Sequence, residues 1–140
     1  MRTAVVGAGI MGASTALALA DRGHDVTIFE QFDLNHARGS SHGRSRIVRK
    51  AYPDAYYTSL MVEGYPMWHR LQQRVSEQIL FESGLVYFGN RGSQNVESLV
   101  VGLRANGVDQ VELDRDAMRE VFPELRLDSD EVGYLTSEAG

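Results

Sequence analysis

The chain has 140 residues, of which 43% are hydrophobic and 24% are charged, as in ordinary globular proteins. Its net charge of −5 gives no electrostatic reason to expect a nucleic-acid partner. The absence of cysteine excludes disulfides and thiolate metal sites within these residues, and it fits the cytoplasmic location that we expect.

The first thirty residues predict a strand, a helix and a second strand. Thr3 to Val6 is a short β-branched and apolar run, which is typical of a buried strand. A glycine-rich turn follows, and the pattern then predicts a helix from Ile10 to Arg22 that Gly23 ends. Asp25 to Glu30 predicts the second strand. This βαβ order indicates a parallel sheet.

The apolar run from Arg2 to Ala20 has an alternative interpretation as a secretory signal. Three glycines interrupt the run, however, whereas the apolar part of a signal is usually a continuous helix, which glycine disfavours. The run is also too short for a membrane span. We therefore favour the βαβ unit and expect no membrane association.

Residues 31–52 predict a long functional loop that carries several arginines. Pro53 fits the first turn of a helix that reaches about Arg74. Five side chains lie near one face of this helix, and we expect them to pack against the protein rather than to bind a cofactor: Leu60, Met61, Met67, Trp68 and Leu71.

Shorter elements follow, which indicates that the architecture changes near residue 77. We expect four strands, at Ile79–Phe81, Leu85–Phe88, Val111–Leu113 and Glu131–Thr136, with a turn at Ser83–Gly84 between the first two. We also expect two helices, one capped by Ser93 that runs through Arg104 and one at Arg115–Val121 capped by Asp114. The fold class is therefore α/β, with a Rossmann-like βαβ unit in residues 1–76 and the start of a mixed α+β domain in residues 77–140.

The glycines after the first strand form a G-x-G-x-x-G motif. Gly7 permits a tight turn, Gly9 lets the backbone approach a pyrophosphate, and Gly12 lets helix and strand pack closely. The helix N-terminus, including the main chain of Ile10 and Met11, offers N–H donors and partial positive charge to phosphates.

Glu30 ends the second strand, where an acidic residue accepts hydrogen bonds from ribose hydroxyls and disfavours the 2′-phosphate of NADP. These features do not separate FAD from NAD. The alternative interpretation is a glycine-rich turn that binds no nucleotide.

The basic segment from Gly39 to Tyr52 reads G-S-S-H-G-R-S-R-I-V-R-K-A-Y. It is similar to the pattern G-S-x-H-G-x-x-R-I-x-R-x-A-Y of monomeric sarcosine oxidase and N-methyltryptophan oxidase, within the D-amino-acid-oxidase-like flavoproteins. The resemblance extends to the segment Gly84–Gly89 and to Phe122-Pro123, and so spans essentially the whole chain. Ser41 departs from the family pattern, which often has histidine there.

The resemblance implies that FAD is the cofactor and that Ser41, His42 and Arg46 contact or flank the flavin. It implies that Arg49 binds the carboxylate of the substrate, and a guanidinium suits this role because it donates two hydrogen bonds in fixed geometry. For His42 we expect a positioning or electrostatic role rather than general-base catalysis. Without the resemblance, the basic run would be interpreted as a solvated face.

The function that the resemblance implies is oxidation of a secondary amine, such as the N-methyl amino acid sarcosine, by hydride transfer to FAD. Molecular oxygen would then be reduced to hydrogen peroxide. The alternatives are a dehydrogenase of the same superfamily with another electron acceptor, a non-catalytic nucleotide-binding module and, less well supported, an NAD-dependent dehydrogenase.

Relatives in this family are much longer, and the cysteine that links FAD covalently and further lysines lie beyond the matched region. We therefore expect this chain to be an N-terminal fragment. His24, His36 and His69 are expected at the surface or in packing, because none has the spacing of metal ligands.

Overall fold

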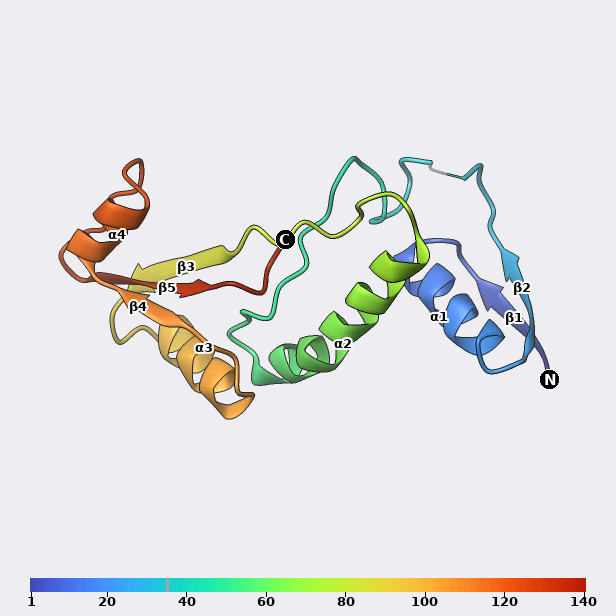
Figure 1. Ribbon diagram of the computed structural model, residues 1–140, viewed down its shortest axis with the longest axis horizontal. Coiled ribbons are helices and arrows are strands. Elements are labelled where there is room, and N and C mark those ends of the chain that lie inside the picture. Colours follow the sequence, from blue (N-terminus) through green and yellow to red (C-terminus); the bar gives the residue numbers. More distant parts are fainter. Residues whose placement is uncertain (35) are drawn as a thin grey trace. The chain divides into compact units, whose positions relative to one another are not determined.

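The computed structural model describes residues 1–34 and 36–140, which form two compact units, 1–46 and 47–140. Figure 1 labels their helices and strands. The fold is α/β, with a parallel βαβ unit and a separate antiparallel sheet. None of the helices in the described residues combines the length and the hydropathy that a membrane-spanning helix requires.

The first unit contains β1 (Arg2–Val6), α1 (Ile10–Ala20) and β2 (Asp25–Phe29). The two strands pair in parallel, so the predicted βαβ unit is confirmed. Apolar side chains remain exposed along this sheet, with Val6 at 87% and Phe29 at 57%. The only buried hydrophobic residue of the unit, among those described, is Ala16 of α1.

The helix α1 ends slightly before the predicted Arg22, but Gly23 terminates it as expected. Gly23 has a φ of +78°, which a residue without a Cβ adopts at little cost. The His24 amide donates to the Leu19 carbonyl at 3.1 Å, and the Gly23 amide donates to the Ala20 carbonyl at 2.8 Å. These two bonds form a Schellman motif that satisfies carbonyls at the helix end.

The second unit begins with an irregular segment and then α2 (Ala55–Arg74). Asp54 is its N-cap and accepts a 2.9 Å hydrogen bond from the Tyr56 amide. The prediction that Pro53 lies in the first turn is therefore wrong, because the Asp54 carboxylate provides the cap one residue later.

The buried face of α2 matches the predicted one only in part. Met61, Trp68 and Leu71 are half-buried, whereas Leu60 and Met67 are 45% and 58% exposed. The fully buried residues of the helix are Thr58 and Tyr65. The hydrophobic pattern alone did not identify this face, because the residues that pack are a threonine and a tyrosine with polar groups of their own.

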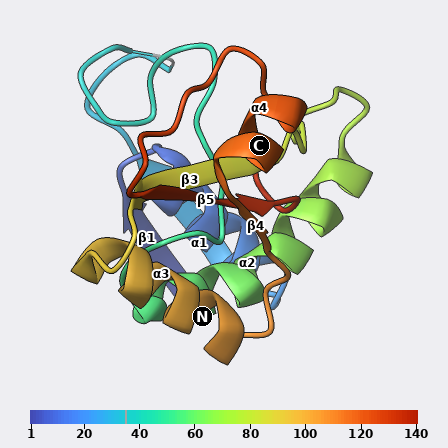
Figure 2. The ribbon, with the colours of Figure 1, turned by 90° about the vertical axis from the view of Figure 1, so that its left-hand side faces the viewer.

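An antiparallel sheet forms the centre of the second unit, with strand order β3 (Leu85–Asn90), β5 (Glu131–Thr136) and β4 (Val111–Leu113). The helices α3 (Gln94–Ala105) and α4 (Arg115–Val121) lie on opposite faces of it (Figure 2). The predicted strand at Ile79–Phe81 is wrong. The amides of Ile79 and Leu80 instead donate to Oε1 of Gln72 in α2, at 2.7 and 3.1 Å.

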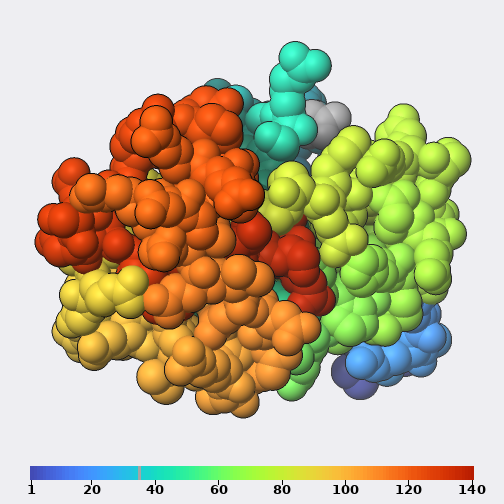
Figure 3. All heavy atoms as spheres, turned by 60° about the vertical axis from the view of Figure 1, so that its left-hand side comes forward, coloured from blue at the N-terminus to red at the C-terminus, as the bar shows by residue number. Residues whose placement is uncertain are grey.

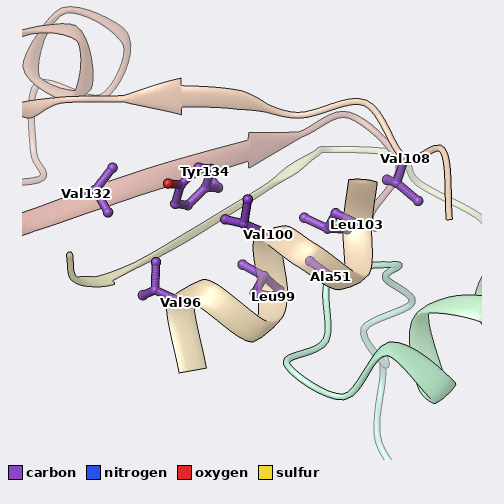
Figure 4. Packing of buried hydrophobic residues seen from close by; sticks show 8 residues of the cluster. All are labelled: Ala51, Val96, Leu99, Val100, Leu103, Val108, Val132 and Tyr134. Atoms are coloured by element: carbon purple, nitrogen blue, oxygen red, sulfur yellow. The ribbon is translucent and has the colours of Figure 1, made fainter. Parts of the chain in front are cut away.

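Two clusters of buried side chains hold this unit together. The larger cluster lies between α3 and β5, and Figure 4 shows its eight members: Ala51, Val96, Leu99, Val100, Leu103, Val108, Val132 and Tyr134. On the other face, Leu113, Met118 and Leu127 pack around α4. Because Ala51 belongs to the larger cluster, the end of the basic segment is anchored in the core.

Candidate functional site

The glycine turn between β1 and α1 requires glycine at two positions for different reasons. Gly7 has a φ of +94°, and its amide donates to the Phe29 carbonyl at 2.7 Å. A Cβ added at Gly12 would overlap the carbonyl oxygen of Gly7. The start of α1 therefore lies directly against the end of β1, as the motif predicts.

Main-chain donors gather at the N-terminus of α1. The Ala8 amide donates to Oε2 of Glu30 at 2.8 Å, and the Ile10 amide donates to Oγ of Ser41 at 3.0 Å. Among the described residues, no acceptor pairs with the amides of Gly9, Met11 and Gly12. Three free donors at the positive end of a helix suit the oxygens of a diphosphate.

A cavity of about 290 Å³ lies beside the turn, and Gly9 is the one of these three residues that lines it. Its walls include Gly7, Gly9, Glu30, Ser41 and His42. A Cβ at Gly9 would lie 3.0 Å from Oγ of Ser41, so a side chain at this position would occupy part of the space between the turn and Ser41. The donor set and the space left by glycine therefore fit the diphosphate of a dinucleotide cofactor. Ile10 and Met11 do not line this cavity, and they are 48% and 79% exposed.

The carboxylate of Glu30 organises the far side of this cavity. It accepts hydrogen bonds from the amides of Ala8, Gln31 and Phe32, and these main-chain donors, Ala8 first, lower the pKa of Glu30. His36 lies 3.5 Å from Oε1, a contact that the sequence interpretation missed. A carboxylate has about four lone pairs, so one remains for a ribose hydroxyl.

The loop that follows places Ser41, His42 and Arg46 in the first unit. His42 is exposed, and its Nδ1 lies 2.5 Å from the Gly39 carbonyl oxygen, so this nitrogen carries the proton. Nε of Arg46 donates to the Ser40 carbonyl at 2.9 Å. No carboxylate among the described residues pairs with Arg46, so its positive charge is not neutralised.

Arg49 belongs to the second unit, where it forms an isolated antiparallel bridge with Ala139. Its guanidinium lies over the ring of Tyr52, 4.7 Å from the centroid. The residue is half-buried, and no carboxylate of the described residues pairs with it. A stacked guanidinium with free donors is suited to binding the carboxylate of a ligand.

Comparison with known proteins identifies the family. Residues 2–140 match the family described as FAD dependent oxidoreductase. The chain belongs to this family of FAD-dependent oxidoreductases. It is 38% identical to the peroxisomal sarcosine oxidase of Mus musculus and 35% identical to the probable sarcosine oxidase of Arabidopsis thaliana, over 97% of this chain in both cases. The chain spans 35% and 33% of the length of these two relatives.

Solved structures agree with the family assignment. An unusual amino acid oxidase essential for nikkomycin biosynthesis has a TM-score of 0.75 and 26% identity over 98% of this chain and 36% of its own. The L-proline dehydrogenase of P. horikoshii has a TM-score of 0.81 at 17% identity over the same shares, which shows a common fold.

Proposed function

We propose that the protein is an FAD-dependent amine oxidase that acts on a secondary amine with a carboxylate, such as the N-methyl amino acid sarcosine. The observation that carries the proposal is the half-buried guanidinium of Arg49, which stacks on Tyr52 and has no carboxylate partner among the described residues. Membership of the FAD-dependent family and similarity to proteins named sarcosine oxidase support it.

In this proposal FAD is held through its diphosphate by the turn between β1 and α1. The amides of Gly9, Met11 and Gly12 donate to phosphate oxygens, and Gly7 gives the turn its shape. The Ile10 amide and Ser41 form the edge of the cradle through their own hydrogen bond. Glu30 accepts from a ribose hydroxyl. We assign cofactor binding to residues 1–76 and the start of the substrate domain to residues 77–140.

Arg49 holds the substrate carboxylate, which fixes the position of the amine-bearing carbon and so removes the entropy cost of a chance encounter. Bound FAD supplies the two-electron acceptor for oxidation of that carbon, and oxygen is the final acceptor. Arg46 and His42 flank the flavin, and the unneutralised charge of Arg46 favours negative charge developing beside it.

We propose the cytoplasm as the compartment in which the protein acts.

The test is steady-state kinetics on the full-length protein with sarcosine, measuring both oxygen consumption and peroxide. Arg49→Met should raise KM by about 30-fold or more, because a charge-assisted contact contributes about 2–4 kcal/mol. Arg44→Met, at an exposed arginine of the same segment, is the matched control and should leave KM unchanged.

Two results would contradict the proposal. An unchanged KM in Arg49→Met would remove its role in carboxylate binding. Reduction of an artificial dye by sarcosine without oxygen consumption would assign the protein to the dehydrogenases instead.

A further inference from the structure

Arg49 lies in a very short piece of sheet. The Val48 amide donates to the Gly140 carbonyl at 2.6 Å, and the Gly140 amide donates back to the Val48 carbonyl at 2.8 Å. These bonds pair Arg49 with Ala139 in a single isolated bridge. A pairing this short has little stability in water by itself, so other contacts have to hold it.

The neighbouring residue Lys50 supplies such a contact. Its side chain is 10% exposed, and Nζ lies 2.5 Å from Oε1 of Glu138. Lys50 is the only lysine in the 140 residues. It is buried, whereas none of the arginines among the described residues is. A buried ammonium is costly unless it is paired, so the ion pair ties the segment of Lys50 to the segment of Glu138.

Tyr65 of α2 contacts both Val48 and Lys50. Its hydroxyl donates to the Val48 carbonyl at 3.1 Å, and its ring lies 5.0 Å from Nζ of Lys50. Burial, with smaller contributions from Glu82 and Glu138, raises the pKa of Tyr65 to about 12. The hydroxyl therefore keeps its proton and its hydrogen bond across the physiological range.

The C-terminal segment is held on its other side as well. The amides of Ser83 and Gly84 both donate to the Ala139 carbonyl at 2.9 Å. Figure 3 shows this segment in red, beside the yellow-green residues that precede β3. The segment opposite Arg49 is thus fixed to the body of the second unit, and the Val48–Gly140 hydrogen bonds and the Lys50–Glu138 ion pair connect it to the arginine segment.

Lys50 itself is a poor candidate for binding the substrate carboxylate. Its ammonium is already paired with Glu138, whereas the guanidinium of its neighbour Arg49 has no carboxylate partner among the described residues. In an extended bridge, adjacent side chains point to opposite sides. Burial of Lys50 therefore decides which side is left for Arg49.

We propose that the Lys50–Glu138 ion pair positions Arg49 for the substrate carboxylate, so that Lys50 and Glu138 are positioning residues of the site. This inference rests on the proposed function. The pair acts by keeping the bridge closed, and the closed bridge keeps the guanidinium over Tyr52.

The test uses Lys50→Met and Glu138→Gln in the full-length protein with sarcosine. Each variant should raise KM about tenfold with little change in kcat, since a small displacement of a binding group weakens alignment of the substrate. In an Arg49→Met background the same substitutions should add nothing, because their effect passes through Arg49. In the double variant with the pair exchanged, Lys50→Glu with Glu138→Lys, KM should fall part of the way back to the wild-type value.

Hydrogen exchange gives a readout that does not depend on activity. The amide of Val48 should exchange faster in both variants, because the bridge opens more often. Glu112→Gln is the matched control: it breaks the Arg91–Glu112 ion pair of the same unit without touching the bridge, and it should alter neither KM nor exchange at Val48.

Faster exchange at Val48 with an unchanged KM for sarcosine would overturn the inference, as would unchanged exchange in both variants. If Lys50→Met does not fold, Glu138→Gln decides, because it keeps the shape of a side chain that is 40% exposed. Failure of the proposed function has a different signature, namely an unchanged KM in Arg49→Met itself.

Discussion

The turn at the start of α1 and the bridge at Arg49 hold their functional groups in different ways. The turn offers main-chain amides, and its requirements are met by glycines at Gly7, Gly9 and Gly12. The bridge offers one side chain, whose direction depends on Lys50 and on partners about ninety positions later in the chain. The first site is a property of local backbone, whereas the second is a property of tertiary packing.

The two units also differ in how completely they bury their apolar residues. In the first unit both strands keep large side chains exposed, as at Val6 and Phe29. In the second unit α3 and β5 enclose a cluster in which Leu99, Leu103 and Val132 are fully buried. We therefore expect substitutions in the two units to have effects of different magnitude and on different properties of the protein.

The largest effect is expected from Gly12→Ala. The new Cβ would overlap the Gly7 carbonyl oxygen, so the helix and the strand would have to separate, at a cost of about 3 kcal/mol or more. The full-length protein should then be purified with less than a tenth of the flavin absorbance per chain. Gly64→Ala is the control, because only the flexible side chain of Met61 lies nearby. Full flavin content in Gly12→Ala would contradict the proposed diphosphate site.

A smaller effect, on stability alone, is expected from truncation in the core. Leu99→Ala should lower the free energy of unfolding by about 2–5 kcal/mol, because Leu99 is fully buried. Leu17→Ala in α1 should cost less than about 1 kcal/mol, since Leu17 is 40% exposed. Urea denaturation measures both, and equal losses would mean that the first unit is packed as tightly as the second.

The smallest effect concerns the dependence of stability on pH. Glu30 has a lowered pKa in the folded protein, so it stabilises the fold above its ordinary value of 4.5. That contribution is lost as the pH falls from 4.5 through the lowered value. The difference in unfolding free energy between wild type and Glu30→Gln should therefore shrink over this acid window. A difference that grows on acidification would mean that the amides do not favour the ionised form.

The sequence predicted the first site better than the second for a physical reason. A tight turn, a close approach and a helix end each restrict the residue at one position, so Gly7, Gly12 and Gly23 are informative alone. The predicted helix cap at Asp114 is confirmed on the same grounds, because its partner, the Ala117 amide, lies three residues away. The family resemblance, rather than these local rules, pointed to Arg46 and Arg49.

Contacts between distant residues could not be predicted in this way. The hydrogen bond from the Ile10 amide to Ser41 joins residues 31 positions apart, and the Lys50–Glu138 pair joins residues 88 apart. The predicted strand at Ile79–Phe81 failed for a similar reason, because the Gln72 side chain takes up the amides that a strand partner would have bound. Neither propensity nor periodicity contains this information.

The bridge between Arg49 and Ala139 has a consequence for biosynthesis. The ribosome releases β1, the glycine turn and β2 early, so the cavity beside the turn can form while translation continues. The guanidinium acquires its orientation only after residue 140 has emerged and a long loop has closed. Under the proposed function, a nascent chain would thus be ready to bind FAD well before Arg49 could bind a substrate carboxylate.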